Sequence, residues 1–96
     1  MHLNELLKSR RDEIIRISVK HGARNVRVFG SVARGDADEK SDIDLLVEFK
    51  IGTTLLNHAA LMLDLEELLG VKVDVFSDRG LRDRIRDRVL REAVAL

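Results

Sequence analysis

The sequence has no cysteine, tryptophan or tyrosine, and its aromatic residues other than histidine are three phenylalanines. The absence of cysteine excludes a disulfide framework and zinc thiolate sites. With so few aromatic side chains, little is available to stack on nucleic-acid bases. Lysine plus arginine equal aspartate plus glutamate at 17 each, which gives a formal net charge of zero. We therefore expect no bulk electrostatic attraction to nucleic acid or to a membrane surface.

The sequence also lacks the segments that would direct it to a membrane. No apolar run approaches membrane-spanning length, and residues 1–5 lack the charged and apolar regions of a signal peptide. We therefore expect a cytoplasmic protein. Its 96 residues, 45% hydrophobic and 35% charged, suit one globular domain over 1–96 with a single core.

Hydrophobic periodicity predicts about four helices and three strands. We expect helices over 3–21, 31–35, 54–69 and 81–96, and strands over 25–29, 41–49 and 71–76. The two strands joined through helix 54–69 should be parallel, with a right-handed crossover. The fold class expected is α/β (α+β), with a small mixed three-stranded sheet packed with helices.

Helix 54–69 is unusually apolar. Its apolar residues form two stripes, one of Leu55, Ala59, Met62 and Leu69 and the other of Leu61, Leu65 and Leu68. One sheet face cannot easily cover both stripes. We expect the surplus stripe to pack on the first helix within the core, and the alternative is a partner surface.

The last predicted helix is rich in arginine, with six arginines between Arg79 and Arg91. The expected role is a solvated face with ion pairs to Asp83, Asp87 and Glu92. The alternative is a basic patch that meets an acidic protein or RNA, although no interleaved aromatics support base stacking.

Small and acidic residues occur where two predicted strands meet. One strand runs into Gly30-Ser31, and the next opens with Asp42 and Asp44, one residue apart. The period of two in a strand turns both aspartates to one face, roughly 7 Å apart, where they repel each other unless a cation lies between them. Magnesium prefers a few carboxylates plus phosphate oxygens and water. Gly30 leaves the backbone open to an anion, and Ser31 can begin a helix whose N–H groups favour phosphate. The stretch therefore predicts a magnesium and phosphate site.

Each half of this pattern also has a plain structural explanation. A Gly-Ser after a strand is commonly a turn, and Asp-x-Asp at a strand start is commonly solvated or capping.

Two better-known phosphate-binding loops are excluded. Gly30 and Gly35 have the outer spacing of a P-loop, but an Asp-Ala pair follows instead of Lys-Ser/Thr. Val32 stands where a dinucleotide fingerprint needs glycine.

Asp74 and Arg34 are further candidates for the same site. Asp74 lies between two valines of a predicted buried strand, where a charge is costly unless it is paired or metal-bound. Parallel pairing would bring it beside the aspartate pair, whereas on an edge strand it would face water. Arg34 can reach a triphosphate, or it can pair with Asp36 or Asp38.

Gly30-Ser31, ten intervening residues and then Asp-Ile-Asp resemble the signature of the DNA polymerase beta type nucleotidyltransferases. The strings Gly-Ser-Val-Ala-Arg-Gly and Ser-Asp-Ile-Asp-Leu-Leu-Val resemble those of the minimal prokaryotic branch of this superfamily, the MNT proteins. The resemblance extends over almost the whole chain and includes its compact size and residues 90–94.

This resemblance implies a mechanism. Asp42 and Asp44 would hold one or two Mg²⁺ ions that bridge the triphosphate of bound ATP, and Asp74 would complete the metal site or take the acceptor's proton. Gly30, Ser31 and nearby N–H groups would hold the terminal phosphates. An acceptor hydroxyl would attack the α-phosphorus in line, and pyrophosphate would leave.

The resemblance also implies a partner. The chain has no residues left for a second domain, so a partner is expected to bring the acceptor. Many stand-alone MNT proteins are antitoxins encoded beside HEPN ribonuclease toxins. By resemblance, this chain would transfer AMP from ATP to a tyrosine of such a toxin and so neutralise it. The alternatives are a non-catalytic module that masks its partner, and an enzyme acting on a small molecule or RNA end. Nucleic acid is not expected as a direct ligand, and a homo-oligomer stays open.

Overall fold

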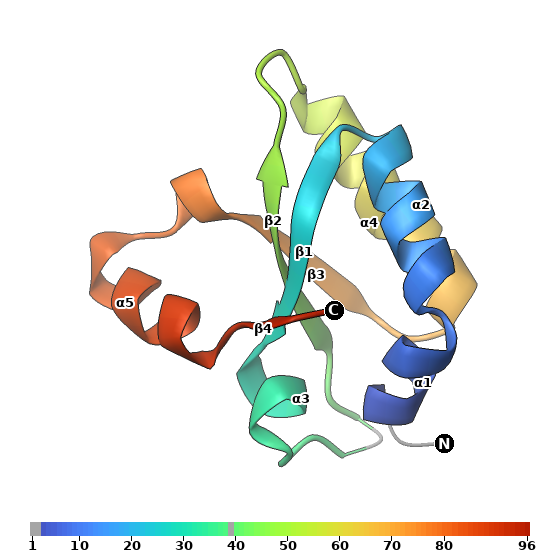
Figure 1. Ribbon diagram of the computed structural model, residues 1–96, viewed down its shortest axis with the longest axis vertical. Coiled ribbons are helices and arrows are strands. Elements are labelled where there is room, and N and C mark those ends of the chain that lie inside the picture. Colours follow the sequence, from blue (N-terminus) through green and yellow to red (C-terminus); the bar gives the residue numbers. More distant parts are fainter. Residues whose placement is uncertain (1–2, 39) are drawn as a thin grey trace.

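The computed structural model describes residues 3–38 and 40–96, and within them a four-stranded sheet packs with five α-helices (Figure 1). The helices are α1 (Leu3–Ser9), α2 (Arg11–Lys20), α3 (Gly30–Arg34), α4 (Leu55–Leu69) and α5 (Asp83–Glu92). The strands are β1 (Ala23–Phe29), β2 (Ile43–Phe49), β3 (Val73–Ser77) and β4 (Val94–Ala95), and a 3₁₀ turn, η1 (Asp78–Gly80), follows β3. The predicted mixed α+β class is confirmed.

The sheet has the strand order β3-β2-β1-β4. β2 and β3 are parallel, as the helix between them predicts, while β1 is antiparallel to both β2 and β4. β2 is the central strand that its apolar run predicts, because four of its residues are fully buried. β3, however, lies at an edge of the sheet, so the expectation that Asp74 sits in a strand buried on both sides is wrong.

The prediction of three strands is also wrong, because the fourth strand comes from a segment predicted to be helical. α5 ends at Glu92, and Ala93 has an extended backbone with φ −64° and ψ 132°. Val94 and Ala95 then pair with Val28 and Arg27 of β1. A two-residue strand with exposed side chains leaves no hydrophobic alternation in the sequence.

The first helix is divided in two. Arg10, with φ −110° and ψ 12°, separates α1 from α2, and the Ser9 hydroxyl donates to the Leu6 carbonyl at the end of α1. Both Leu7 of α1 and Ile14 of α2 are buried in the same core. The break lets each helix present its own apolar residues to the sheet.

α4 begins and ends as the sequence predicts. Thr54 caps it in a reciprocal capping box with Asn57, and Gly70 ends it in the left-handed conformation with φ 70°. Within the described residues, none of the helices is both long enough and apolar enough to cross a membrane.

The two faces of the sheet differ in what covers them. The helix-covered face, to which β2 contributes Ile43, Leu45 and Val47, packs against α2 and α4. The opposite face, here called the open face, includes Phe29 and Leu46, and within the described residues α5 and the segments on either side of it cover part of this face (Figure 1).

The expectation that the stripe of Leu55, Ala59, Met62 and Leu69 packs within the core is confirmed for Met62 and Leu69, which pack in the core cluster, and is wrong for Leu55 and Ala59. The buried residues of α4 are Leu61, Leu65 and Leu69, whereas Leu55 and Ala59 are exposed. The helix turns one stripe to the sheet and leaves another on its outer side.

Candidate active site

Asp44 and Asp74 lie side by side on the open face of the sheet. They are direct neighbours in the parallel register of β2 and β3. Side chains alternate along a strand, so both point to the same side as Leu46 and away from the buried Ile43 and Val73. The predicted approach of Asp74 to Asp44 is therefore confirmed, although it occurs at an edge strand where Asp74 is partly exposed.

Gly30 packs directly against Asp44. The residue before it, Phe29, is the antiparallel partner of Asp44 across β1 and β2. Gly30 has a positive φ of 74°, and a Cβ atom there would overlap Asp44 Oδ2 and lie 3.3 Å from Asp44 Cγ. Only glycine combines this backbone conformation with this close approach. The predicted meeting of the Gly-Ser pair with the aspartates is confirmed for Gly30 and Asp44.

The short helix α3 begins one residue earlier than predicted. Gly30 is its first residue, Phe29 occupies the N-cap position, and no side chain caps the helix. Ser31 therefore lies inside the first turn, partly exposed, and does not act as the N-cap. α3 ends at Arg34, and Gly35 after it, with φ 81°, is the left-handed cap that the sequence predicts.

The electrostatics of the site are dominated by negative charge. Partial burial raises the pKa of Asp44 above its ordinary value, and the neighbouring carboxylates of Asp74 and Asp42 raise this pKa further. The positive charge of Arg34 acts in the opposite direction but is the smallest of these influences. The ionised form of Asp44 therefore lacks compensation, which a bound cation would supply.

The donor atoms at this site suit a hard divalent cation, since magnesium needs only one or two carboxylates besides phosphate oxygens and water. Asp42, however, lies just before β2 and is close to Lys72, with 3.9 Å between its Oδ2 and Nζ. In ranges 3–38 and 40–96, no group of three or more histidine, aspartate or glutamate side chains is arranged to hold a metal ion. The residues fit a magnesium site by their chemistry, and a third carboxylate ligand would require Asp42 to turn from Lys72.

Arg34 joins α3 to α5. Its Nε lies 3.3 Å from Asp36 Oδ2, and its Nη1 lies 3.4 Å from both carboxylate oxygens of Glu92. Pairing with Asp36 is one of the two predicted alternatives, whereas Asp38 instead bonds to Ser41 and the Lys40 amide. Sequence reasoning missed the contact with Glu92, because residues 58 positions apart carry no local signal of contact.

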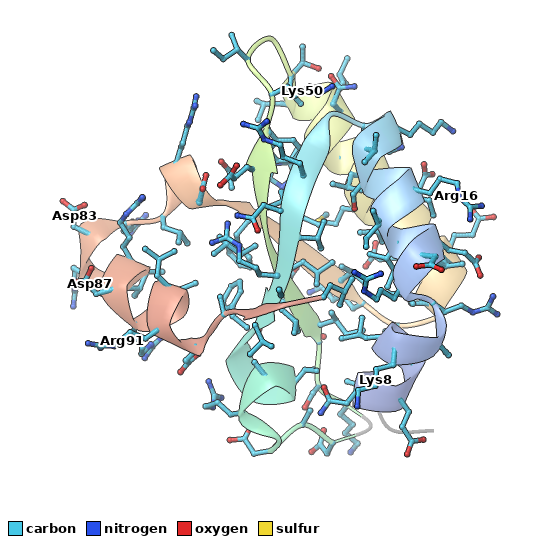
Figure 2. All side chains as sticks on the ribbon, in the orientation of Figure 1. Lys8, Arg16, Lys50, Asp83, Asp87 and Arg91 are labelled. Atoms are coloured by element: carbon cyan, nitrogen blue, oxygen red, sulfur yellow. The ribbon has the colours of Figure 1, made fainter. Side chains whose placement is uncertain are left out.

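The arginines of α5 do not form the predicted ion pairs within the helix. Across the described residues, no ion pair joins them to Asp83 or Asp87, and Glu92 pairs with Arg34 instead. Figure 2 shows Asp83, Asp87 and Arg91 on the side of α5 that points away from the sheet. The nearby Arg86 donates to the carbonyl of Asp78 at 2.6 Å, which ties α5 to the turn after β3.

Comparison with known proteins identifies the class of protein that this fold and site define. The family model described as a nucleotidyltransferase domain matches residues 7–96. The chain belongs to this family and is a nucleotidyltransferase enzyme, and the resemblance seen in its motifs is confirmed.

Individual relatives cover nearly the whole chain. A Methanocaldococcus jannaschii protein, provisionally named protein adenylyltransferase MJ0435, is 44% identical over 98% of this chain and 97% of its own length. Protein adenylyltransferase MntA of Thermococcus cleftensis is 44% identical over 78% of this chain and 76% of its own. A solved structure described provisionally as a minimal nucleotidyltransferase is 59% identical with a TM-score of 0.87, and the match covers 96% of this chain and 94% of that one.

More distant structures share the fold. A toxin–antitoxin crystal structure with AMP-PNP contains a chain that is 21% identical with a TM-score of 0.76, over 88% of this chain and 69% of that one. At this identity the likeness concerns the fold alone.

Proposed function

We propose that this chain is an antitoxin that transfers AMP from ATP to a tyrosine hydroxyl of a cognate HEPN ribonuclease toxin and so neutralises it. The observation that carries the proposal is the contact of the Gly30 backbone with Asp44, which in turn faces Asp74. This contact brings the backbone at the start of α3 directly beside the acidic groups, so that a phosphate chain and a cation can bind next to each other. The names of the relatives, protein adenylyltransferases, support a protein as the acceptor.

In this proposal the three aspartates share one task. Asp42, Asp44 and Asp74 would hold one or two Mg²⁺ ions, which when bound neutralise charge on the triphosphate and lower the pKa of the acceptor hydroxyl. The raised pKa of Asp44 supports this role, because a carboxylate whose charge is poorly compensated gains most from a cation. Asp74, on the more accessible edge strand, would lie toward the acceptor, where it would complete the metal site or take the acceptor's proton.

The nucleotide would be held from the α3 side. The N–H groups at Gly30 and Ser31 would contact the terminal phosphates, because they lie in the first turn of α3 beside Asp44, and Ser31 is partly exposed. Arg34 would exchange its long contacts with Asp36 and Glu92 for a phosphate oxygen, since both contacts are 3.3 Å or longer and its side chain is 47% exposed. The acceptor oxygen then attacks the α-phosphorus in line, a bond from phosphorus to that oxygen forms, and pyrophosphate leaves with the electron pair of the broken bond.

Label transfer tests the proposal directly. The purified chain is incubated with magnesium, α-labelled ATP and the protein encoded by the adjacent gene, and the products are examined by mass spectrometry. We expect label on the neighbour, with the mass gain of one AMP at a tyrosine. The Asp42→Asn, Asp44→Asn double variant should transfer none. The matched control is Asp83→Asn, Asp87→Asn, which makes the same charge change on the outer side of α5 and should transfer normally.

Two results would contradict the proposal. A stable complex without label would favour a module that masks its partner by binding. Label only on a small molecule or an RNA end would move the acceptor to another class, although the chain would still be a nucleotidyltransferase.

A further inference from the structure

The outer side of α4 carries large apolar side chains that nothing in the described chain covers. We call Leu55, Leu56, Ala59 and Leu63 the α4 stripe. Leu55, Leu56 and Leu63 are 86%, 82% and 62% exposed, and Ile51 in the preceding loop is 91% exposed. Scattered exposed leucines are ordinary, but several on one side of one helix indicate an interaction surface.

This surface is separate from the candidate active site. α4 packs on the helix-covered face of the sheet, whereas Asp44 and Asp74 lie on the open face, on the side of α5 (Figure 1). A partner on the α4 stripe would therefore leave the nucleotide and its acceptor free to bind.

The stripe is symmetric about Ala59. Leu55 lies one turn before Ala59 and Leu63 one turn after it, so the order Leu, Ala, Leu reads the same in both directions. When two copies of α4 pack antiparallel about a two-fold axis at Ala59, each Leu55 faces the Leu63 of the other copy. The small side chain at the axis allows the two helices to approach closely.

The charges of α4 also suit antiparallel packing of two copies. Its charged residues, Asp64, Glu66 and Glu67, all lie in the C-terminal half, and its last turn has no basic residue. Such a distribution is unfavourable for the dipole of the helix itself. Asp64 pairs with His21 and Glu66 accepts from the Val73 N–H within the chain, whereas Glu67 is exposed. In an antiparallel pair, Glu67 lies beside the N-terminal end of the other copy.

A lysine is available at that N-terminal end. Lys50 lies in the loop before α4 (Figure 2), and in the part of the chain that the structure describes neither Lys50 nor Glu67 has an ion-pair partner. Antiparallel packing about Ala59 brings Glu67 of one copy toward the loop that carries Lys50 of the other.

We propose that the occupant of the α4 stripe is a second copy of this chain, which forms a two-fold homodimer through antiparallel packing of α4 about Ala59. The self-complementary order of the stripe and the opposite charges at its two ends both fit an identical partner. The dimer does not depend on the proposed acceptor, because its interface and the active site lie on opposite faces of the sheet.

Sedimentation equilibrium tests the dimer over micromolar to millimolar concentrations. We expect the wild-type chain to reach twice its monomer mass. Leu55→Ser with Leu63→Ser should weaken the dimer by about 100-fold or more, because two-fold symmetry removes four leucines from the interface. The matched control is Leu90→Ser, at a partly exposed leucine of α5, which should dimerise normally.

The wild type, the double variant and the control should transfer AMP at similar rates if the proposed function holds. A wild-type chain that stays monomeric, or a dimer that survives the double substitution, would overturn the proposal.

Cross-linking tests the position of the axis. The chain has no cysteine, so Ala59→Cys introduces its only thiol. Facing Cα atoms at the axis would lie about 5 Å apart when the helix axes are about 10 Å apart, which suits a disulfide. Mild oxidation should therefore give a covalent dimer. With Glu67→Cys, the two thiols would lie about 24 Å apart along the helices, and no such dimer should form. Efficient cross-linking at residue 67 but not at 59 would refute the antiparallel register.

A charge exchange tests the same register without oxidation. Lys50→Glu alone and Glu67→Lys alone should each weaken the dimer, because each places two like charges opposite one another. The two substitutions in the same chain should restore the dimer, because residues 50 and 67 of facing copies then again carry opposite charges. If the chain stays monomeric and binds a different protein through the α4 stripe, that protein and not a second copy is the occupant of the stripe, and the proposal is overturned.

Discussion

The two faces of the sheet use neighbouring residues of β2 for opposite purposes. Ile43, Leu45 and Val47 face the helices, and none is measurably exposed to solvent. Asp44, between the first two, faces the open side with an acidic neighbour and an incomplete cover. One face gains stability by excluding water, and the other retains a charge repulsion that a ligand would relieve. Substitutions on the two faces should therefore change different measured quantities.

The largest expected effect is a loss of activity without a loss of stability when Asp44 on the open face is substituted. Asp44→Asn should lower the rate of label transfer by about 1000-fold, equivalent to about 4 kcal/mol, because it removes a charged metal ligand. The same change should stabilise the fold by up to about 1 kcal/mol, because it removes a like charge directly opposite Asp74. Urea unfolding and label transfer on the same sample measure both. An activity close to wild type would show that the open face is not the catalytic site.

The second effect compares two fully buried leucines that follow one another in β2. Leu45→Ala should destabilise the protein by about 4 kcal/mol, because it opens a cavity among many packed side chains. Leu46→Ala should cost less, about 2 to 3 kcal/mol, because its smaller cluster under α5 can collapse into the space. Equal changes in the free energy of unfolding would mean that α5 packs as rigidly as α2 and α4.

The third effect compares two glycines with similar backbones. Gly30 and Gly70 have φ values of 74° and 70°, but a Cβ at residue 30 would overlap Asp44, whereas a Cβ at residue 70 meets nothing within 4 Å. Gly70→Ala should therefore cost only the conformational strain, about 1 kcal/mol. Gly30→Ala should cost about 2 to 3 kcal/mol and also displace Asp44. Identical losses in thermal stability would refute the close contact at the site.

The smallest effect is a dependence of stability on pH. Because the folded protein raises the pKa of Asp44, the folded state binds more protons than the unfolded state between the ordinary pKa and the raised one. The contribution of this group to stability is therefore fully present below the ordinary pKa and is lost as the pH rises through the raised value.

The comparison with Asp44→Asn isolates this contribution. The stability of the wild type relative to that variant should fall with rising pH by less than about 1 kcal/mol. Magnesium should oppose the fall in the wild type only. A relative stability that rises with pH would mean that the charged form of Asp44 is already compensated.

The sequence predicts the site better than it predicts the sheet. Gly30 follows β1 and Asp44 lies near the start of β2, so the pairing of these two strands brings them together. Strand alternation was applied to Asp42 as well, but β2 begins one residue after it, at Ile43. Parallel pairing across a helical crossover then brings in Asp74. These steps use local periodicity and one topological rule, so they could be made before the structure was known.

Elements that depend on distant contacts could not be predicted in this way. β4 forms because Val94 and Ala95 meet β1, and a segment of two residues is too short to show the alternation that predicts a strand. Likewise the sequence around Arg10 contains no glycine or proline that would predict the break between α1 and α2. The contact of Glu92 with Arg34 depends on the packing of α5 beside α3. In each case tertiary packing outweighs the local preference on which sequence reasoning depends.

The strand order also has a consequence for how fast the protein folds. Every pair of adjacent strands is connected through at least one helix: β1 and β2 through α3, β2 and β3 through α4, and β1 and β4 through most of the chain. No tight hairpin in the described chain can therefore form first and serve as a template. Each pairing must close a loop before it gains contacts, so folding should be slower than for a helical bundle of the same length.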